Sequence, residues 1–415
     1  MSRKTKTTTT KEVGKPALTP KLRFPEFRDA EGWHATPGDE LFEQINNRQA
    51  HAGLPILAIT QEHGAIPRDA IDYHVSVTDK SVETYKEVRP GDFIISLRSF
   101  QGGIEYSEYH GICSPAYVIL RKRAELSDQF FKPLFKSHSF IQQLTKNLEG
   151  LRDGKMISYK QFSELLLPNP TQPEQQKLAE CLSSVDEVIA AQARKLDALK
   201  SHKKGLMQEL FPREGETQPR LRFPEFQDAP EWGEKKLSSM VQLVSGTHLS
   251  PDQYGKEKGV PYFTGPSDFT NDIQSITKRT NESSGIAKEN DTLITVKGSG
   301  VGTIWYLTLF SIAMGRQLMA IRATDGVSRF VYQFLLTKKS RFGDLASGNL
   351  IPGLSRGDIL DLDAPITSTP EQQRVADCLT SLDNLISAQA QKLEALKTHK
   401  KGLMQQLFPS PEEEV

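Results

Sequence analysis

The chain has 415 residues, of which 37% are hydrophobic and 25% charged, and its 52 basic side chains balance 52 acidic ones. This length favours two or more domains, and the lack of any apolar run of 18 residues argues against a transmembrane helix. A net charge of zero argues against a protein that binds DNA by phosphate neutralisation alone.

Residues 1–20 are rich in Lys and Thr and lack the apolar core of a secretory signal, so we expect a disordered tail. Cys113, Cys181 and Cys378 have neither paired nor metal-ligand spacing. Reduced thiols in a cytoplasmic protein are the simplest interpretation.

Two variable regions follow, at residues 21–170 and 214–367, and both mix short β-rich runs with glycine- and proline-containing turns. We expect compact α/β (α+β) domains with long loops. The predicted strands are Asp92–Leu97, Tyr117–Leu120, Thr292–Val296 and Leu318–Ile321, and the predicted helices are Ser127–Leu148 and Ser328–Leu345.

The chain contains an internal repeat. PEQQKLAECLSSVDEVIAAQARKLDALKSHKKGLMQELFP from Pro173 recurs from Pro370 as PEQQRVADCLTSLDNLISAQAQKLEALKTHKKGLMQQLFP. Upstream, KLRFPEF from Lys21 recurs as RLRFPEF from Arg220, and GDFIISLR recurs more faintly as NDTLITVK. The stretches between these anchors hardly match, which indicates one architecture with two different interiors.

The repeated segments, 171–213 and 368–409, carry apolar residues alternately four and three apart, which is typical of a coiled-coil seam. The first seam comprises Leu178, Leu182, Val185, Ile189, Gln192, Leu196, Leu199, Lys203, Leu206 and Leu210. The second comprises Val375, Leu379, Leu382, Ile386, Gln389, Leu393, Leu396, Lys400, Leu403 and Leu407. The alternative is an amphipathic helix packed on its own domain.

An acidic tail, 410–415, follows the second repeated segment.

Two near-identical segments in one chain are expected to pair antiparallel, and one register matches every layer. It places Leu178 opposite Leu407, and it brings Lys203 within reach of Asp383 and Lys400 within reach of Asp186. Each helix would be roughly 55 Å long, which exceeds one DNA turn of about 34–36 Å. Gly205 and Gly402 lie inside the predicted helices at matching positions, where another backbone, such as that of a partner helix, is expected to pack closely. A helix irregularity near the C-terminal end is the alternative.

Variable domains alternating with two long repeated helices, entered through PEQQ and closed by KKGLMQ-x-LFP, resemble the specificity subunits of type I restriction–modification systems. The resemblance implies two target recognition domains in a pseudo-twofold arrangement, joined by an antiparallel coiled coil and reading a split, asymmetric DNA site. It also implies docking of two methyltransferase subunits, which bring S-adenosylmethionine, and two motor-nuclease subunits, which use ATP and Mg. This chain would itself carry no cofactor or metal, and we expect no self-association.

Base readout in the major groove uses Arg or Lys on guanine and Asn or Gln on adenine. The loops SLRSFQGG and TVKGSG, together with a Gly-Arg pair, provide the DNA-binding candidates Arg98, Gln101, Lys297, Ser299 and Arg316. Tight turns carrying solvated side chains are the alternative interpretation. Weaker candidates are His63, Arg68, Thr247 and His248.

No catalytic motif is evident, since KGSGVGT lacks the ending of a phosphate-binding loop and Asn169-Pro170 lacks the continuation of an adenine methyltransferase motif. We therefore expect a non-catalytic binding protein. Two alternatives remain open: a coiled-coil adaptor that organises other proteins without reading DNA, and an enzyme with a nonstandard site.

Overall fold

The computed structural model describes residues 18–48, 53–71, 82–123, 125–146, 157–213, 215–282, 285–298, 300–347 and 353–409. The chain forms two compact units. Unit 1 comprises residues 1–192 and 392–415, and unit 2 comprises residues 193–391. Two helices of 39 residues, α7 (Gln172–Leu210) and α11 (Thr369–Leu407), are each divided between the two units.

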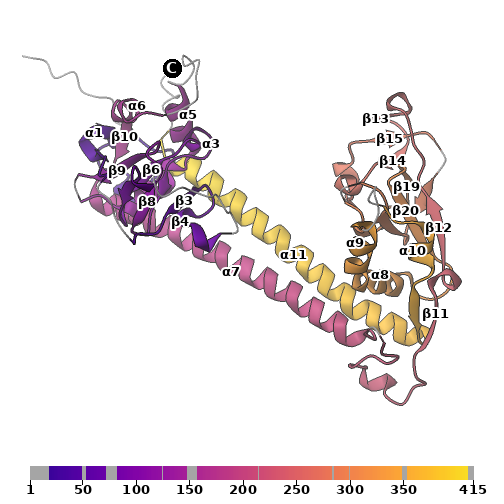
Figure 1. Ribbon diagram of the computed structural model, residues 1–415. Coiled ribbons are helices and arrows are strands. Elements are labelled where there is room, and N and C mark those ends of the chain that lie inside the picture. The colour runs from indigo at the N-terminus through magenta and orange to yellow at the C-terminus, as the bar shows by residue number, and fades with distance from the viewer. Residues whose placement is uncertain are drawn as a thin grey trace, which may run out of the picture. The chain divides into compact units, whose positions relative to one another are not determined.

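Unit 1 is built around an antiparallel sheet in the order β2-β9-β6-β7, whose central strands β9 and β6 are labelled in Figure 1, and α4 packs against β7. Its strands are β2 (Phe42–Ile45), β9 (Val118–Lys122), β6 (Phe93–Ile95) and β7 (Glu105–Tyr106). The other paired strands are β1 (His34–Pro37) with β10 (Leu166–Asn169), β3 (Leu57–Thr60) with β4 (Gly64–Pro67), and β5 (Lys86–Val88) with β8 (Gly111–Cys113). The helices are α1 (Gly38–Leu41), α3 (Ser99–Gly102), α4 (Asp128–Phe135), α5 (His138–Lys146) and α6 (Tyr159–Ser163), with 3-10 turns at Pro25–Phe27 and Arg68–Ala70.

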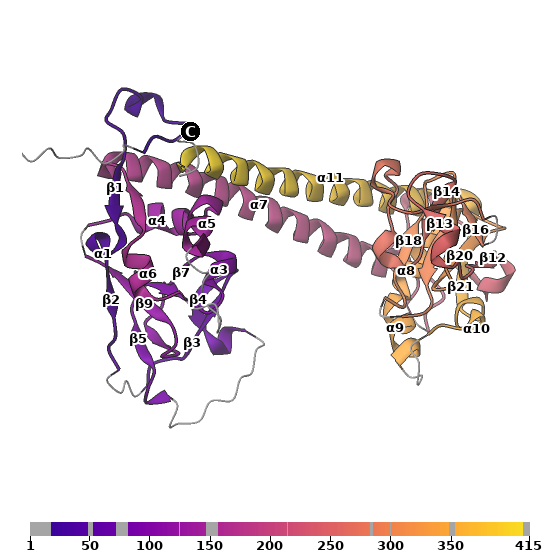
Figure 2. The ribbon, with the colours of Figure 1, turned by 90° about the horizontal axis from the view of Figure 1, so that it is seen from above.

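Unit 2 repeats this order in its sheet β12-β20-β17-β18, and α8 packs against β18 and β20 (Figure 2). These strands are β12 (Val241–Ser245), β20 (Leu318–Ala323), β17 (Thr292–Thr295) and β18 (Ile304–Tyr306). A second sheet contains β13 (Tyr254–Gly255), β15 (Arg279–Thr280), β14 (Val260–Phe263), β19 (Ser311–Met314) and β16 (Ile286–Lys288), and β11 (Gly233–Lys236) pairs with β21 (Asp363–Ile366). The helices are α8 (Ser328–Thr337), α9 (Lys339–Ser347) and α10 (Arg356–Leu360), and 3-10 turns lie at Pro224–Phe226, Leu237–Ser239, Pro251–Gln253, Pro266–Asp268 and Ile273–Ser275.

Each single helix predicted after the sheet is in fact two helices. In unit 1 the predicted helix Ser127–Leu148 is divided at Lys136–Ser137 into α4 and α5. The Ser137 hydroxyl accepts a hydrogen bond from the backbone N–H of Phe140 (3.3 Å), so it caps the start of α5. In unit 2 the predicted helix Ser328–Leu345 is similarly divided at Lys338 into α8 and α9.

The ends of the long helices belong to the domain cores. In unit 1, Leu178 and Leu182 of α7 and Leu407 of α11 join one buried cluster with the sheet and α4. In unit 2, Leu210 of α7 and Val375 of α11 do the same. The helix ends therefore pack on domains, as in the alternative interpretation, while the seam continues between these ends.

The seam has the predicted antiparallel register. Every seam position is buried or half-buried, whereas most residues between them are exposed. Within unit 2 the Lys203 Nζ lies 2.6 Å from the Asp383 Oδ1, and within unit 1 the Lys400 Nζ lies 2.6 Å from the Asp186 Oδ1. Both ion pairs were predicted from the sequence and are confirmed.

A buried ion pair fixes the start of each long helix to its LRFPEF segment. Arg23 donates to both carboxylate oxygens of Glu174 (2.7 and 2.8 Å), and Arg222 does so to Glu371 (2.6 and 2.9 Å). Both glutamates are 1% exposed, and the bidentate geometry compensates for burying their charge.

None of the described residues supplies the close backbone expected at the helix glycines. Among the residues that the structure describes, no heavy atom beyond the helix itself would lie within 4 Å of a Cβ atom built on Gly205 or Gly402. Both helices nevertheless continue through these positions without interruption.

Candidate nucleic-acid interface

In unit 1 the loop after β6 presents two of the candidate DNA-binding residues. Arg98 precedes the short helix α3 and Gln101 lies within it, and both are exposed. Neither side chain makes a hydrogen bond or ion pair with the described residues. Gly103 closes the loop with a φ of +82°, and a Cβ there would lie 2.0 Å from the Phe135 carbonyl oxygen, so only glycine fits.

The β3–β4 hairpin packs its tip against this loop. A Cβ on Gly102 would lie 2.6 Å from the Gln61 side chain, and the Gln61 amide donates to the Arg98 carbonyl oxygen at 3.4 Å. The absence of a side chain at residue 102 therefore lets Gln61 lie beside Arg98. Tip and loop together line a hollow of about 760 Å³.

This hollow brings together residues that are far apart in the sequence. Arg98, Arg68, His63 and Tyr117 all line it, so two weaker candidates join a stronger one. One guanidinium nitrogen of Arg68 is buried without a hydrogen-bond partner among the described residues. Burial raises the pKa of Tyr117, although the positive charges of Arg68 and Arg98 oppose that rise. The Tyr117 hydroxyl therefore stays protonated at neutral pH. Beside the exposed Glu62 carboxylate, Arg98, Arg68 and Tyr117 offer the hollow hydrogen-bond donors, which suit the acceptor atoms of guanine or a phosphate.

In both units a buried ion pair joins the two central strands that carry the candidate loops. Arg121 on β9 donates to Asp92 at 2.7 Å, and Arg322 on β20 donates to Asp291 at 2.7 Å. Both aspartates are 1% exposed. The matching pairs hold the central strands in the same way while the loops above them differ.

In unit 2 the candidates lie on two neighbouring loops. Lys297 follows β17 and is exposed, and Gly298 next to it has a φ of +92°. Arg316 is exposed in the turn between β19 and β20. Ser299 lies outside the described residues. The Val296 N–H donates to the Gln317 carbonyl oxygen at 2.7 Å, which joins the two loops.

A third loop approaches the Arg316 turn. The Thr247 N–H donates to the Met314 carbonyl oxygen at 2.8 Å, and a Cβ on Gly246 would lie 2.1 Å from the Gly315 carbonyl oxygen. The exposed pair Thr247–His248 therefore lies next to that turn.

Three further residues belong to these sites and were not among the sequence candidates. Gln61 and Tyr117 line the hollow in unit 1, and Gln317 holds the corresponding position to Tyr117, directly before β20 as Tyr117 is before β9. Alignment of the two strands across the repeat would have identified the pair Tyr117 and Gln317. Gln61 carries no such signal, because the hairpin region diverges between the copies.

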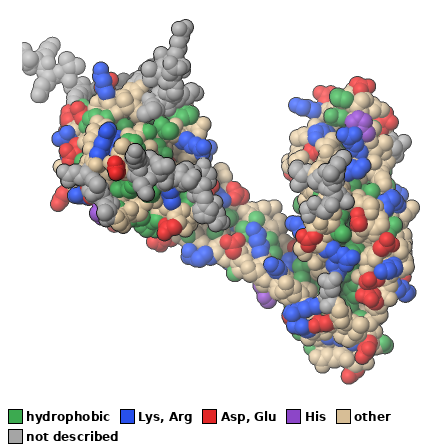
Figure 3. Space-filling model, viewed as in Figure 1, with side chains coloured by type: hydrophobic (Ala, Val, Ile, Leu, Met, Phe, Trp, Pro, Cys, Tyr) green, Lys and Arg blue, Asp and Glu red, His purple; other side chains and the backbone are tan. Residues whose placement is uncertain are grey.

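The surface charge is mixed. On the face of unit 2 in Figure 3, Lys and Arg side chains lie among Asp and Glu side chains. Within the described ranges, no cluster of three or more His, Cys, Asp and Glu residues is placed to hold a metal ion. None of the helices described is both long and apolar enough to cross a membrane.

Comparison with known proteins links this architecture to one family. Residues 230–398 match the family model described as "Type I restriction modification DNA specificity domain". The MjaX specificity subunit of Methanocaldococcus jannaschii, named for a type I restriction enzyme, is 26% identical over 280 residues, covering 66% of this chain and 65% of that protein. The MjaVIII specificity subunit from the same organism is 23% identical over 364 residues, covering 80% and 81%.

Solved structures share the fold. A chain from a study of complex assembly and conformational transition of a type I R-M system has a TM-score of 0.58 at 20% identity, covering 91% of this chain and 98% of that one. The S subunit of a type I restriction–modification system from M. genitalium has a TM-score of 0.56 at 17% identity, covering 94% and 99%.

Proposed function

We propose that the chain is a specificity subunit of a type I restriction–modification system and that it reads DNA, each unit recognising one half of a split site. One observation carries this proposal: equivalent loop positions on matching scaffolds bear different side chains. Arg98 corresponds to Lys297, and Tyr117 corresponds to Gln317. Two units of one topology with different reading groups would recognise two different sequences.

The side chains indicate which base edges each unit prefers. Arg98 can donate two hydrogen bonds to O6 and N7 of guanine, and Lys297 can contact the same atoms as a point charge. Gln101 and Gln317 have the donor and acceptor pair that matches N7 and N6 of adenine. Arg316 and Arg68 are suited to phosphate oxygens or guanine.

The long helices would serve as spacer and docking platform. Their exposed surface is similar in both copies, although Glu187 and Arg194 correspond to Asn384 and Gln391 in the second copy, so it can bind two copies of one partner, whereas the divergent loops cannot. We place the chemistry in those partners: two methyltransferase subunits with S-adenosylmethionine, and two motor-nuclease subunits with ATP and Mg. This chain would act without catalysis and without a cofactor of its own.

The test is a domain exchange. Residues 22–150 are replaced by the equivalent region of another specificity subunit, and methylated adenines are mapped in a host that supplies the methyltransferase. The proposal expects one half of the recognised sequence to change and the other half to persist. A change in both halves would contradict the modular reading, and sequence-independent behaviour would favour an adaptor role.

A further inference from the structure

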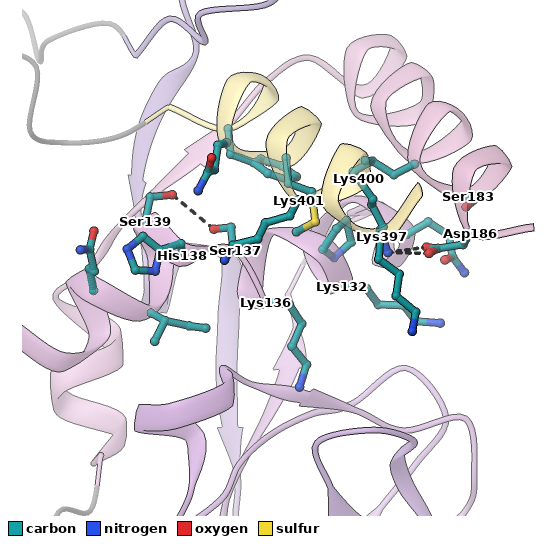
Figure 4. A pocket seen from close by; sticks show the side chains of 18 of the residues that line it. Lys132, Lys136, Ser137, His138, Ser139, Ser183, Asp186, Lys397, Lys400 and Lys401 are labelled. Atoms are coloured by element: carbon teal, nitrogen blue, oxygen red, sulfur yellow. Dashed lines mark hydrogen bonds and ion pairs between the residues drawn. The ribbon is translucent and has the colours of Figure 1, made fainter. Parts of the chain in front are cut away.

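A second hollow in unit 1, of about 750 Å³, lies where α4 and α5 meet the start of α7 and the end of α11 (Figure 4). Its lining contains six lysines and a single carboxylate, that of Asp186. The lysines are Lys21, Lys132, Lys136, Lys397, Lys400 and Lys401. Leu182, Met404 and Phe408 add apolar surface.

Three of these lysines form ion pairs with carboxylates of unit 1 while still lining the hollow. Lys132 pairs with Glu108 (3.0 Å), Lys136 pairs with Glu105, and Lys400 pairs with Asp186. Lys397 pairs only with an exposed glutamate one turn earlier on α11, and Lys401 makes no ion pair with the described residues. The uncompensated charge of the hollow is therefore concentrated on α11.

At the equivalent place in unit 2 a glutamine of α8 is buried against α11. There Gln333 of α8 is 1% exposed and donates to the Asp383 Oδ2 at 2.8 Å, beside the ion pair from Lys203. Tyr332 next to it packs on Tyr306 at 5.3 Å. In unit 1, Pro133 corresponds to Gln333 and has no side-chain amide that could donate to Asp186. Lys132 corresponds to Tyr332, and its Nζ lies 3.8 Å from the centre of the Tyr106 ring.

The hollow lies beside the point where the described part of α11 ends. Phe408 lines it, is 2% exposed and contacts the Phe130 ring at 5.7 Å. The Leu22 N–H also donates to the Gln406 carbonyl oxygen at 3.0 Å. The position from which the next residues leave is thus fixed.

We propose that the acidic segment Glu412–Glu414 binds in this lysine-lined hollow. The segment lies outside the described residues, and Glu412 follows Pro409 by three positions, a reach of about 10 Å. Its three carboxylates complement the lysines of α11, and its flanking Pro411 and Val415 suit the apolar surface. The first copy of the repeat continues differently, into Arg213-Glu214-Gly215-Glu216, where an arginine and a glycine interrupt the acidic residues.

Binding of this segment would neutralise the lysines and exclude other polyanions, including the backbone of DNA. The attraction is between charges near the surface, so it weakens as salt shortens the screening length to about 3 Å at 1 M. This inference goes beyond the proposed function, because it concerns a surface that no base would contact.

The test measures lysine reactivity in the full chain. Wild type and the variant E412Q/E413Q/E414Q are treated briefly with an amine-acylating reagent, and each lysine is quantified by mass spectrometry. Lys200 and Lys204, the exposed counterparts of Lys397 and Lys401 in the first copy of the repeat, are the internal control. The proposal expects labelling of Lys397 and Lys401 to rise several-fold in the variant, with Lys200 and Lys204 unchanged.

High salt should bring wild type toward the variant, since it weakens the same contacts. Equal labelling of Lys397 and Lys401 in both proteins would overturn the proposal. Protection of these lysines only after duplex DNA is added, in both proteins alike, would also overturn it and would assign the hollow to DNA. Neither readout depends on sequence-specific recognition, so failure here is distinguishable from failure of the proposed function.

Discussion

The Lys203 ammonium lies 2.6 Å from the Asp383 carboxylate, and only 8% of Lys203 is exposed. Its counterpart in unit 1, Lys400 with Asp186, has the same length but is more open to solvent, with 54% of the Asp186 side chain exposed. The same pair in two environments allows the contribution of burial to be measured.

Removing the aspartate should be costly in unit 2 and mild in unit 1. Asp383→Ala leaves Lys203 buried without its counter-ion and Gln333 without its acceptor, so we expect a loss of about 2–3 kcal/mol. Asp186→Ala breaks a solvent-exposed pair and should cost below about 1 kcal/mol. Hydrogen exchange of each unit would measure both, and equal losses would contradict the role of burial.

The missing amide in unit 1 can be supplied. Pro133→Gln should let residue 133 donate to Asp186 as Gln333 donates to Asp383, and it removes a proline from inside α4. We expect unit 1 to gain about 1 kcal/mol or more in unfolding free energy. The matched control, Gln333→Ala, should destabilise unit 2. Denaturant unfolding checks both, and a destabilised Pro133→Gln would show that the two junctions are not equivalent.

Acid should weaken unit 1 through Glu87. Hydrogen bonds from Arg89, and further ones from His110 and Asn47, lower its pKa to about 2 although burial opposes them. A carboxylate with a lowered pKa stabilises the folded state above its unfolded value of about 4.5, and this contribution disappears as pH falls from there toward 2.

Comparison with Glu87→Gln isolates this group. Wild-type unit 1 should lose more stability between pH 5 and pH 3 than the variant, by about 1–2 kcal/mol. Chemical denaturation at each pH provides the measurement. Parallel pH profiles for the two proteins would show that Glu87 does not carry the effect.

Each unit should determine the base preference of one DNA half-site only. Arg98→Ala should relax the base preference at one position of one half-site, at a cost of about 1–3 kcal/mol, because a bidentate donor is lost. Lys297→Ala should affect only the other half-site. Binding to libraries randomised in each half, at fixed salt, would show the division. An effect of Arg98→Ala on both halves would contradict it.

Substitution of the helix glycines tests whether they belong to the docking surface for the methyltransferase subunits. The alanine side chains of Gly205→Ala and Gly402→Ala would meet no other group of the described ranges, so each change should stabilise its helix by about 0.5–1 kcal/mol. If methyltransferase subunits pack closely there, the same changes should weaken their binding. Calorimetric titration with the methyltransferase would decide, and unchanged affinity would remove these glycines from the docking surface.

The sequence by itself determined the duplicated organisation, the long helices and their register. Seam residues such as Leu178 and Leu407 recur at regular spacing, and the repeat shows which segments are equivalent. Because this information is local and periodic, it is also sufficient to predict the ion pairs of Lys203 and Lys400.

Only the tertiary structure decided which loop residues meet and where hollows form. Arg68, Arg98 and Tyr117 line one hollow because a hairpin folds over a turn, and no period in the sequence records that contact. The break between α4 and α5 depends on the Ser137 cap, and the lysine-lined hollow depends on the packing that lets Pro133 and Asp186 line the same space. Such contacts join residues far apart in divergent segments, so their geometry follows from packing rather than from local pattern.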